Sequence, residues 1–193
     1  MSSAIEILLK TQKTVFAIQE LSFLWKIRNS NTLKSKIYFL VKNKKLISLK
    51  KGIYALNQNY DKFELANKLR PPSYISLETV LRNSGIIFQY SSDIISISNI
   101  SKTIKCQRIN YVYHKIKNEV LFNKMGIKIS DKYWIAEPER AFLDIIYLNK
   151  NYYFDNLSQI NWGKCFSLVE IYKNKALKKR LKDYFKDVEK SKT

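Results

Sequence analysis

The sequence has few of the residues from which small catalytic and metal sites are usually built. Of 193 residues, one is histidine (His114), two are cysteines (Cys106 and Cys165), and four are isolated glycines. A single histidine excludes paired-imidazole zinc sites and weakens any Ser-His or Cys-His scheme. The two distant cysteines form no Cys-x-x-Cys motif or disulfide framework, so we expect reduced thiols. Isolated glycines provide no loop for a nucleotide phosphate, and we expect neither a cofactor nor a metal.

Long apolar runs are also absent. No uncharged segment approaches the roughly 18 to 20 apolar residues of a membrane helix, and the first residues lack the basic flank and cleavage site of a signal peptide. With 46% hydrophobic and 26% charged residues, the composition is that of a globular protein and not of a disordered one. We therefore expect a cytoplasmic protein with no membrane partner.

Acidic residues are missing from one long window, Leu21 to Tyr60. Residues 1–57 carry eleven basic and two acidic side chains, within a chain of 35 basic and 16 acidic residues and a net charge of +19. The predominance of lysine over arginine is typical of an AT-rich genome, which makes the total charge a weak indicator. Codon bias adds lysines, but it does not remove acids from a window. The distribution therefore predicts a polyanionic partner.

The first 57 residues have the pattern of a winged helix-turn-helix domain. Apolar residues recur at helical spacing in 3–9, 18–26 and 33–41, and Ser30, Asn31 and Thr32 are capping residues before the third helix. Two short strands, 46–49 and 53–56, follow, joined by Lys50, Lys51 and Gly52. Three helices followed by a hairpin predict a DNA-binding domain over residues 1–57.

Residues 58–193 predict a larger mixed α+β domain that ends in a helix. Expected helices are 61–69, ended by Pro71 and Pro72, then 76–84, 138–148 and a lysine-rich tail, 167–189, with a break near Asn174. Segments rich in Ile, Val, Tyr and Phe predict strands over 86–90, 94–98, 103–113, 120–129 and 132–136. The expected fold class is therefore α+β.

The third predicted helix supplies the candidates for the major groove. With Leu33 directed inward, the outward face holds polar and basic residues, whereas Phe39 is expected in the core or between domains. Asparagine can pair with adenine, hydroxyls can bond bases or phosphates, and lysines neutralise phosphate. The predicted DNA-binding residues are Asn31, Thr32, Lys34, Ser35, Lys36, Tyr38, Lys42, Lys44, Lys45, Lys50 and Lys51.

One carboxylate cluster, Glu137, Glu139 and Asp144, invites a catalytic interpretation. On a helix, Glu139 and Asp144 lie about 140° apart and do not converge. Glu137 and Glu139 beside Pro138 more simply supply negative charge to a helix N-terminus. A metal-dependent nuclease, the enzyme alternative, often has Glu-x-Lys or Gln-x-Lys on one strand, and neither occurs here. We therefore do not expect an enzyme.

Three segments resemble a known family. They are Lys51-Gly52-Ile53-Tyr54-Ala55-Leu56, Arg70-Pro71-Pro72-Ser73-Tyr74-Ile75-Ser76-Leu77-Glu78 with Gly85-Ile86, and Ile135-Ala136-Glu137-Pro138-Glu139-Arg140-Ala141-Phe142-Leu143-Asp144 with Tyr147-Leu148. In order and spacing they are similar to the AbiEi-like antitoxins and transcriptional regulators of bacterial abortive-infection (type IV) toxin–antitoxin systems. Asn83-Ser84 stands where many members have Tyr-His, so no role tied to that histidine is carried over.

The resemblance covers roughly residues 1–150 and implies an autorepressor that binds its own promoter. It also implies an antitoxin domain that counteracts a nucleotidyltransferase-type toxin. Direct contact with the toxin and self-association on DNA are left open. Two other interpretations stand beside it: a protein-interaction module that binds an acidic partner without a DNA role, and the nuclease.

Overall fold

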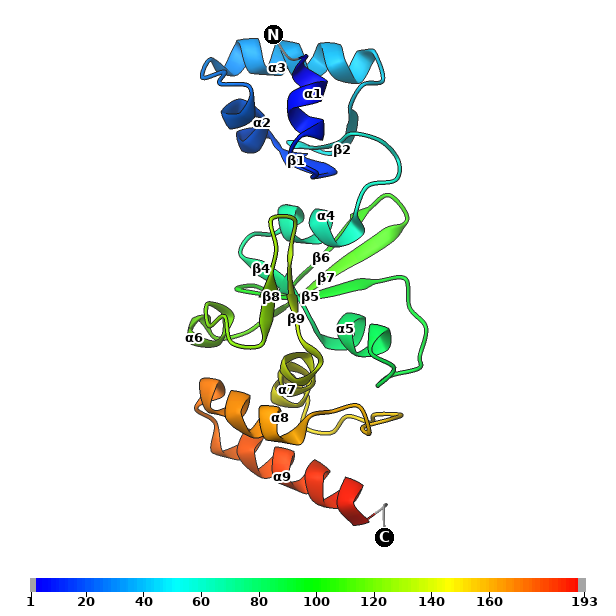
Figure 1. Ribbon diagram of the computed structural model, residues 1–193, viewed down its shortest axis with the longest axis vertical. Helices are drawn as coiled ribbons and strands as arrows, with labels where there is room; N and C mark the ends of the chain where they lie inside the picture. Colours follow the sequence, from blue (N-terminus) through cyan, green and yellow to red (C-terminus); the bar gives the residue numbers. More distant parts are fainter. Residues whose placement is uncertain (1–2, 191–193) are drawn as a thin grey trace. The chain divides into compact units, whose positions relative to one another are not determined.

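The computed structural model describes residues 3–190, and the chain divides into two compact units (Figure 1). The first unit is Met1–Pro71 with Cys106–Arg108, and the second is Pro72–Lys105 with Ile109–Thr193. The sequence places the boundary earlier, near residue 58. The division lies after helix α4 (Lys62–Leu69) because Glu64 of this helix is bonded to Thr14 of the first unit. The Glu64 carboxylate accepts hydrogen bonds from the backbone nitrogen and from the hydroxyl of Thr14, both at 2.8 Å.

The first unit combines helices with a three-stranded antiparallel sheet of order β1-β3-β2. Three helices and two of the strands follow the predicted order, and the sequence did not predict β1. The elements before α4 are α1 (Ala4–Leu9), β1 (Val15–Ala17), α2 (Ile18–Leu24), α3 (Ser30–Lys42), β2 (Ile47–Lys50) and β3 (Ile53–Ala55).

A hydrophobic core joins these three helices to the sheet. Leu33, Ile37 and Leu40 of α3 are buried at the three- and four-residue spacing that turns one helical face inward. They pack with Leu8, Phe16, Leu21, Trp25 and Leu46. The indole of Trp25 also donates a hydrogen bond to the Ala4 carbonyl at 3.0 Å, which ties α1 to the end of α2.

The second unit is built on a six-stranded mixed sheet of order β6-β7-β5-β4-β9-β8. Strand β4 pairs antiparallel with β5 and parallel with β9, and β5 pairs parallel with β7. The strands are β4 (Ser73–Ile75), β5 (Ile94–Ser98), β6 (Lys102–Cys106), β7 (Ile109–Lys115), β8 (Ile127–Ile129) and β9 (Trp134–Ala136). The mixed α+β class predicted from the sequence is therefore confirmed.

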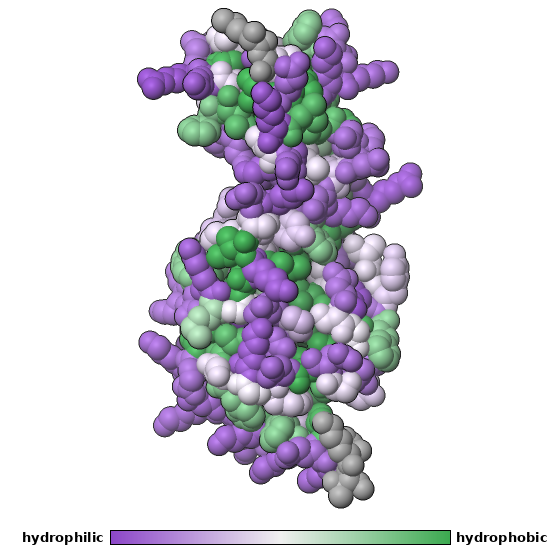
Figure 2. Space-filling model, in the orientation of Figure 1, coloured by the Kyte–Doolittle hydropathy of each residue, from purple (hydrophilic) through white to green (hydrophobic). Residues whose placement is uncertain are grey.

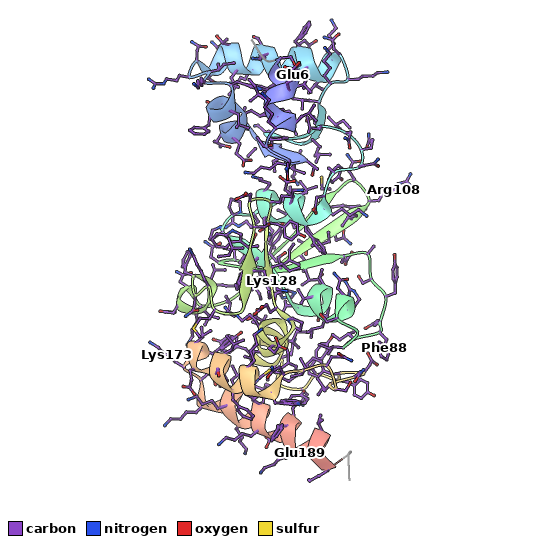
Figure 3. All side chains as sticks on the ribbon, viewed as in Figure 1. Glu6, Phe88, Arg108, Lys128, Lys173 and Glu189 are labelled. Carbon is purple, nitrogen blue, oxygen red and sulfur yellow. The ribbon has the colours of Figure 1, made fainter. Side chains whose placement is uncertain are left out.

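Helix α7 is the centre of the helical layer in the second unit (Figure 1). Residues 139–146 of α7 are all buried, and the Phe142 ring lies 4.9 Å from that of Phe154 and 5.7 Å from that of Tyr184 between centroids. The predicted break near Asn174 falls at Lys173, the residue labelled in Figure 3 between the 3-10 turn and the last helix. The backbone of Lys173 is left-handed, with φ 47°. The helical segments are α5 (Leu77–Asn83), α6 (Asn118–Leu121), α7 (Pro138–Leu148), α8 (Trp162–Leu168), the 3-10 turn η1 (Val169–Tyr172) and α9 (Lys175–Lys190).

Several predicted strands of the second unit are wrong. Segment 86–90 forms no strand, 103–113 is the β6–β7 hairpin, and 120–129 divides into the end of α6, a loop and β8. Strand β4, which the sequence did not predict, has only three residues and exists through its pairing with β5 and β9. Composition indicates β-propensity in these segments, but pairing with distant partners decides which residues become strands.

Among the described residues, no helix combines the length and apolar character needed to span a membrane.

Candidate nucleic-acid interface

Helix α3 is fixed at its start by Asn29. The Asn29 side-chain oxygen accepts hydrogen bonds from the backbone nitrogens of Asn31 and Thr32, at 3.0 Å each. Asn29 is therefore the N-cap, and the predicted capping residues Ser30, Asn31 and Thr32 form the first turn instead. The cap satisfies two backbone donors and leaves the Asn31 side chain on the outside of the helix.

The outward face of α3 presents the residues that the spacing predicts. At about 100° per residue, Asn31, Ser35, Tyr38 and Lys42 lie opposite Leu33, and all four are exposed. Lys36 differs, because it lies about 60° from Leu33 and its ammonium sits 4.8 Å from the centre of the Trp25 ring. The structure thus places Lys36 off the outward face. Every predicted DNA-binding residue except Lys36 is exposed: Asn31, Thr32, Lys34, Ser35, Tyr38, Lys42, Lys44, Lys45, Lys50 and Lys51.

Phe39 contradicts the prediction that it is buried. Its side chain is 62% exposed, next to Tyr38 at 68%. The ring lies outward because position 39 is about 120° from Leu33 on the helix. Residue type indicated the core, whereas the helical angle gave the correct side.

The β2–β3 hairpin presents two of the lysines at its turn. Lys50 is the last residue of β2, one residue later than predicted, and Lys51 and Gly52 form the turn. Gly52 has φ +79°, a conformation that costs glycine little, and its carbonyl accepts a hydrogen bond from Ile18 at 2.9 Å. The turn is therefore ordered, while the side chains of Lys50 and Lys51 are exposed.

Lys44 occupies a backbone position that favours glycine. It follows the C-terminus of α3 with φ 56°, in the left-handed region. The backbone nitrogens of Lys44 and Lys45 close the helix on the carbonyls of Val41 and Leu40, at 3.0 and 2.8 Å. The chain turns sharply there and leaves both lysine side chains in solvent.

No acid neutralises this basic surface. Within residues 3–190, no ion pair involves Lys34, Lys42, Lys44, Lys45, Lys50 or Lys51. The four acids of residues 1–71 bind elsewhere: Glu6 closes the capping box of α1, Glu20 pairs with Lys13 and Lys68, Asp61 caps α4, and Glu64 holds Thr14. In Figure 2, hydrophilic side chains extend outward along α3. The surface therefore retains a positive potential suited to phosphate.

The carboxylates that invited a catalytic interpretation do not meet. Glu137 and Glu139 both pair with Lys164, at 2.8 and 3.4 Å. The hydrogen bond to Glu137, together with the two carboxylate charges, raises the pKa of that lysine. Glu137 is the N-cap of α7 and Glu139 lies in its first turn, as predicted. Glu139 also accepts a hydrogen bond from the backbone of Asn161, which it uses to hold the start of α8. Among the described residues, no three His, Cys, Asp or Glu side chains gather as a metal site would require.

Asp144 lies instead in a buried network that the sequence did not predict. Its carboxylate accepts hydrogen bonds from the hydroxyls of Tyr74, Ser76 and Tyr172, at 3.0, 2.7 and 2.6 Å, and pairs with Arg140 at 3.4 Å. Burial and the neighbouring carboxylate raise the pKa of both tyrosines, which keeps their hydroxyls protonated as donors. Ser76 is the N-cap residue of α5, but its hydroxyl donates to Asp144 and makes no side-chain hydrogen bond to that helix.

Arg140 extends this network to the backbone. Its guanidinium donates hydrogen bonds to the carbonyls of Val120 and Met125, at 2.7 and 2.9 Å, and to the Tyr74 hydroxyl at 3.0 Å. Both charged groups are fully buried. The network joins β4, α6, α7 and η1. Because both buried charged groups have hydrogen-bond partners, we interpret it as a structural network and not as a catalytic site.

No protein-family model matches the sequence, and no curated protein matches it.

Proposed function

We propose that the first unit is a winged helix-turn-helix domain that binds duplex DNA. In this proposal α3 enters the major groove, and the β2–β3 hairpin is the wing that lies along the phosphate backbone. The observation that carries the proposal is the outward face of α3, where Asn31, Ser35, Tyr38 and Lys42 are all exposed and no acid among the described residues of the first unit pairs with Lys42.

The proposed DNA contacts divide into two chemical classes, and substitutions in the two classes should affect DNA binding differently. Asn31 and Ser35 have the donors and acceptors that read base edges, whereas Lys50 and Lys51 supply charge without sequence information. Loss of a base contact relaxes specificity, and loss of a phosphate contact weakens binding to every sequence alike.

A gel-shift titration with DNA from directly upstream of the gene and a scrambled duplex of equal composition tests this division. We expect Asn31→Ala and Ser35→Ala to reduce the ratio of the two affinities. We expect Lys50→Ala with Lys51→Ala to lower both affinities and to keep their ratio. If all four substitutions leave both affinities unchanged, the contact surface is assigned incorrectly, as it would be for a module that binds only an acidic protein.

From the family resemblance we also propose that the chain is an autorepressor and an antitoxin against a nucleotidyltransferase-type toxin. Co-expression with the product of the adjacent gene tests the second part. We expect a co-directional neighbour that encodes a nucleotidyltransferase to arrest growth alone and to lose that effect when this chain is present. Growth arrest that persists in the presence of this chain contradicts the antitoxin role and leaves DNA binding unaffected.

A further inference from the structure

Helix α3 exposes two aromatic side chains beside the residues proposed to contact DNA. Phe39 is 62% exposed and Tyr38 is 68% exposed. Tyr38 carries a hydroxyl that can hydrogen-bond to water, a base or a phosphate. Phe39 has no polar atom, and burying a phenylalanine side chain is worth about 1.5 to 3 kcal/mol. Phe39 is therefore the more informative of the two.

Phe39 lies among the residues proposed to read bases. It follows Ser35 by one helical turn, about 40° around the axis, and precedes Lys42 by three residues, about 60° away. Its carbonyl accepts hydrogen bonds from the backbone and side chain of Asn43, at 3.0 and 2.8 Å, so the backbone beneath the ring is held in place. If α3 lies in a groove, the ring enters beside the Ser35 hydroxyl.

Only one group in the major groove suits this ring. A phenyl group cannot donate to a phosphate or to a base acceptor. Among the four base pairs, the thymine C5-methyl is the single apolar group exposed in the major groove, and phenylalanine is one of the side chains that contact it.

We propose that Phe39 contacts a thymine methyl group, so that the preferred duplex carries thymine at the position beneath this ring. The inference rests on the proposed DNA-binding function and names the base that it recognises. It assigns to Phe39 a specificity-determining role, in place of the core role that its residue type suggested.

Replacing thymine by deoxyuridine tests the proposal because it removes only the methyl group. The probe is the tightest-binding duplex recovered from a randomised pool, synthesised with deoxyuridine at each thymine position in turn. For the unmodified protein we expect the substitution at one or two positions to weaken binding about three- to fivefold, the factor for one buried methyl group. The remaining positions should have little effect.

Substitution of Phe39 then tests whether its ring causes the discrimination between thymine and deoxyuridine. Phe39→Ala should bind the thymine duplex more weakly and lose all discrimination between thymine and deoxyuridine. Phe23→Ala is the matched control, because Phe23 is an 83% exposed phenylalanine on α2 of the same unit. This control should retain the full discrimination. Because both rings are exposed, both variants should unfold at the same urea concentration as the unmodified protein.

The possible results distinguish this proposal from the function on which it depends. Sequence-specific binding that is indifferent to deoxyuridine at every position overturns the thymine contact and leaves DNA binding intact. Discrimination that persists in Phe39→Ala overturns it as well. A change in sedimentation mass in Phe39→Ala with unaltered discrimination would assign the ring to contact between copies and would also overturn it. Absence of any sequence-specific binding contradicts both this proposal and the proposed function.

Discussion

Lys44 combines an unfavourable backbone with a position on the proposed DNA surface. Side chains with a Cβ are disfavoured in the left-handed region by roughly 1 to 2 kcal/mol relative to the right-handed one. Glycine is the usual residue at the position that ends a helix in this way. The backbone of Lys44, at φ 56°, therefore lowers the stability of the folded state, while its charged side chain is exposed beside the end of α3. Strained residues of this kind often accompany function.

We expect Lys44→Gly to change stability and DNA affinity in opposite directions. The free energy of unfolding should rise by about 0.5 to 1 kcal/mol, because the strain is relieved. DNA affinity should fall at low salt, because one positive charge is lost. Urea unfolding and gel shifts measure the two effects. Gln12→Gly is the control, since Gln12 has the same φ of 56° and lies outside the predicted surface; it should gain stability with no change in affinity. Equal DNA affinity for Lys44→Gly and the unmodified protein would contradict a role for Lys44.

Among the single substitutions considered, we expect the largest loss in the free energy of unfolding at the buried ion pair of Arg140 and Asp144. Removing one partner of a buried ion pair leaves an uncompensated charge and costs about 3 to 5 kcal/mol. Asp144→Ala should therefore reduce the free energy of unfolding by that amount, as measured in urea. The control is Glu170→Ala, whose side chain is 65% exposed in its pair with Lys178, and which should change stability by less than about 0.5 kcal/mol. A loss of under about 1 kcal/mol in Asp144→Ala would mean that the network does not hold the second unit together.

At the scale of elements, Glu20 joins three parts of the first unit. Its carboxylate accepts a hydrogen bond from the backbone of Ala17 at the start of α2 and pairs with Lys13, before β1, and with Lys68 of α4. Burial alone would raise the pKa of Glu20, but the hydrogen bonds from Lys68 and Ala17 and the two lysine charges outweigh it and lower the pKa below its ordinary value of 4.5.

This lowered pKa makes part of the stability pH-dependent. A carboxyl with a lower pKa in the folded state contributes its full stabilisation above the unfolded pKa, and loses it as the pH falls through the folded pKa. Glu20→Gln should therefore be less stable than the unmodified protein by about 1 kcal/mol at pH 7. The difference should diminish as the pH falls below 4.5. Urea unfolding from pH 7 to pH 3 measures it, with Glu119→Gln, at an exposed site, as the control. A difference that stays constant with pH would contradict the assignment.

The elements that sequence predicts well are those with their own internal signal. Leu33, Ile37 and Leu40 define α3 and its outward face because their spacing is a local property. Strand β1 has only three residues and is defined by pairing with Ile53–Ala55, far along the chain, which periodicity does not show. The same holds for Asp144, whose partner Tyr74 lies 70 residues away. Local pattern thus predicts the candidate surface, while the buried network needs the fold.

At the scale of the whole molecule, total charge and local charge make different predictions. The chain carries a net charge of +19, and lysines cover α9 as well as the first unit. A protein attracted to DNA only by its overall charge would respond to the loss of any exposed lysine. A protein that places particular lysines on phosphates would respond only to those.

Two double variants of equal charge separate these cases. Lys50→Ala with Lys51→Ala changes the wing, and Lys182→Ala with Lys186→Ala changes exposed positions of α9, so that each lowers the net charge from +19 to +17. For each, the logarithm of the binding constant is measured against the logarithm of salt concentration. The slope should become less steep by about 1.8 for the wing variant, since each phosphate contributes about 0.9. It should stay unchanged for the α9 variant. If both slopes change equally, overall charge governs binding, and the wing lysines hold no particular phosphates.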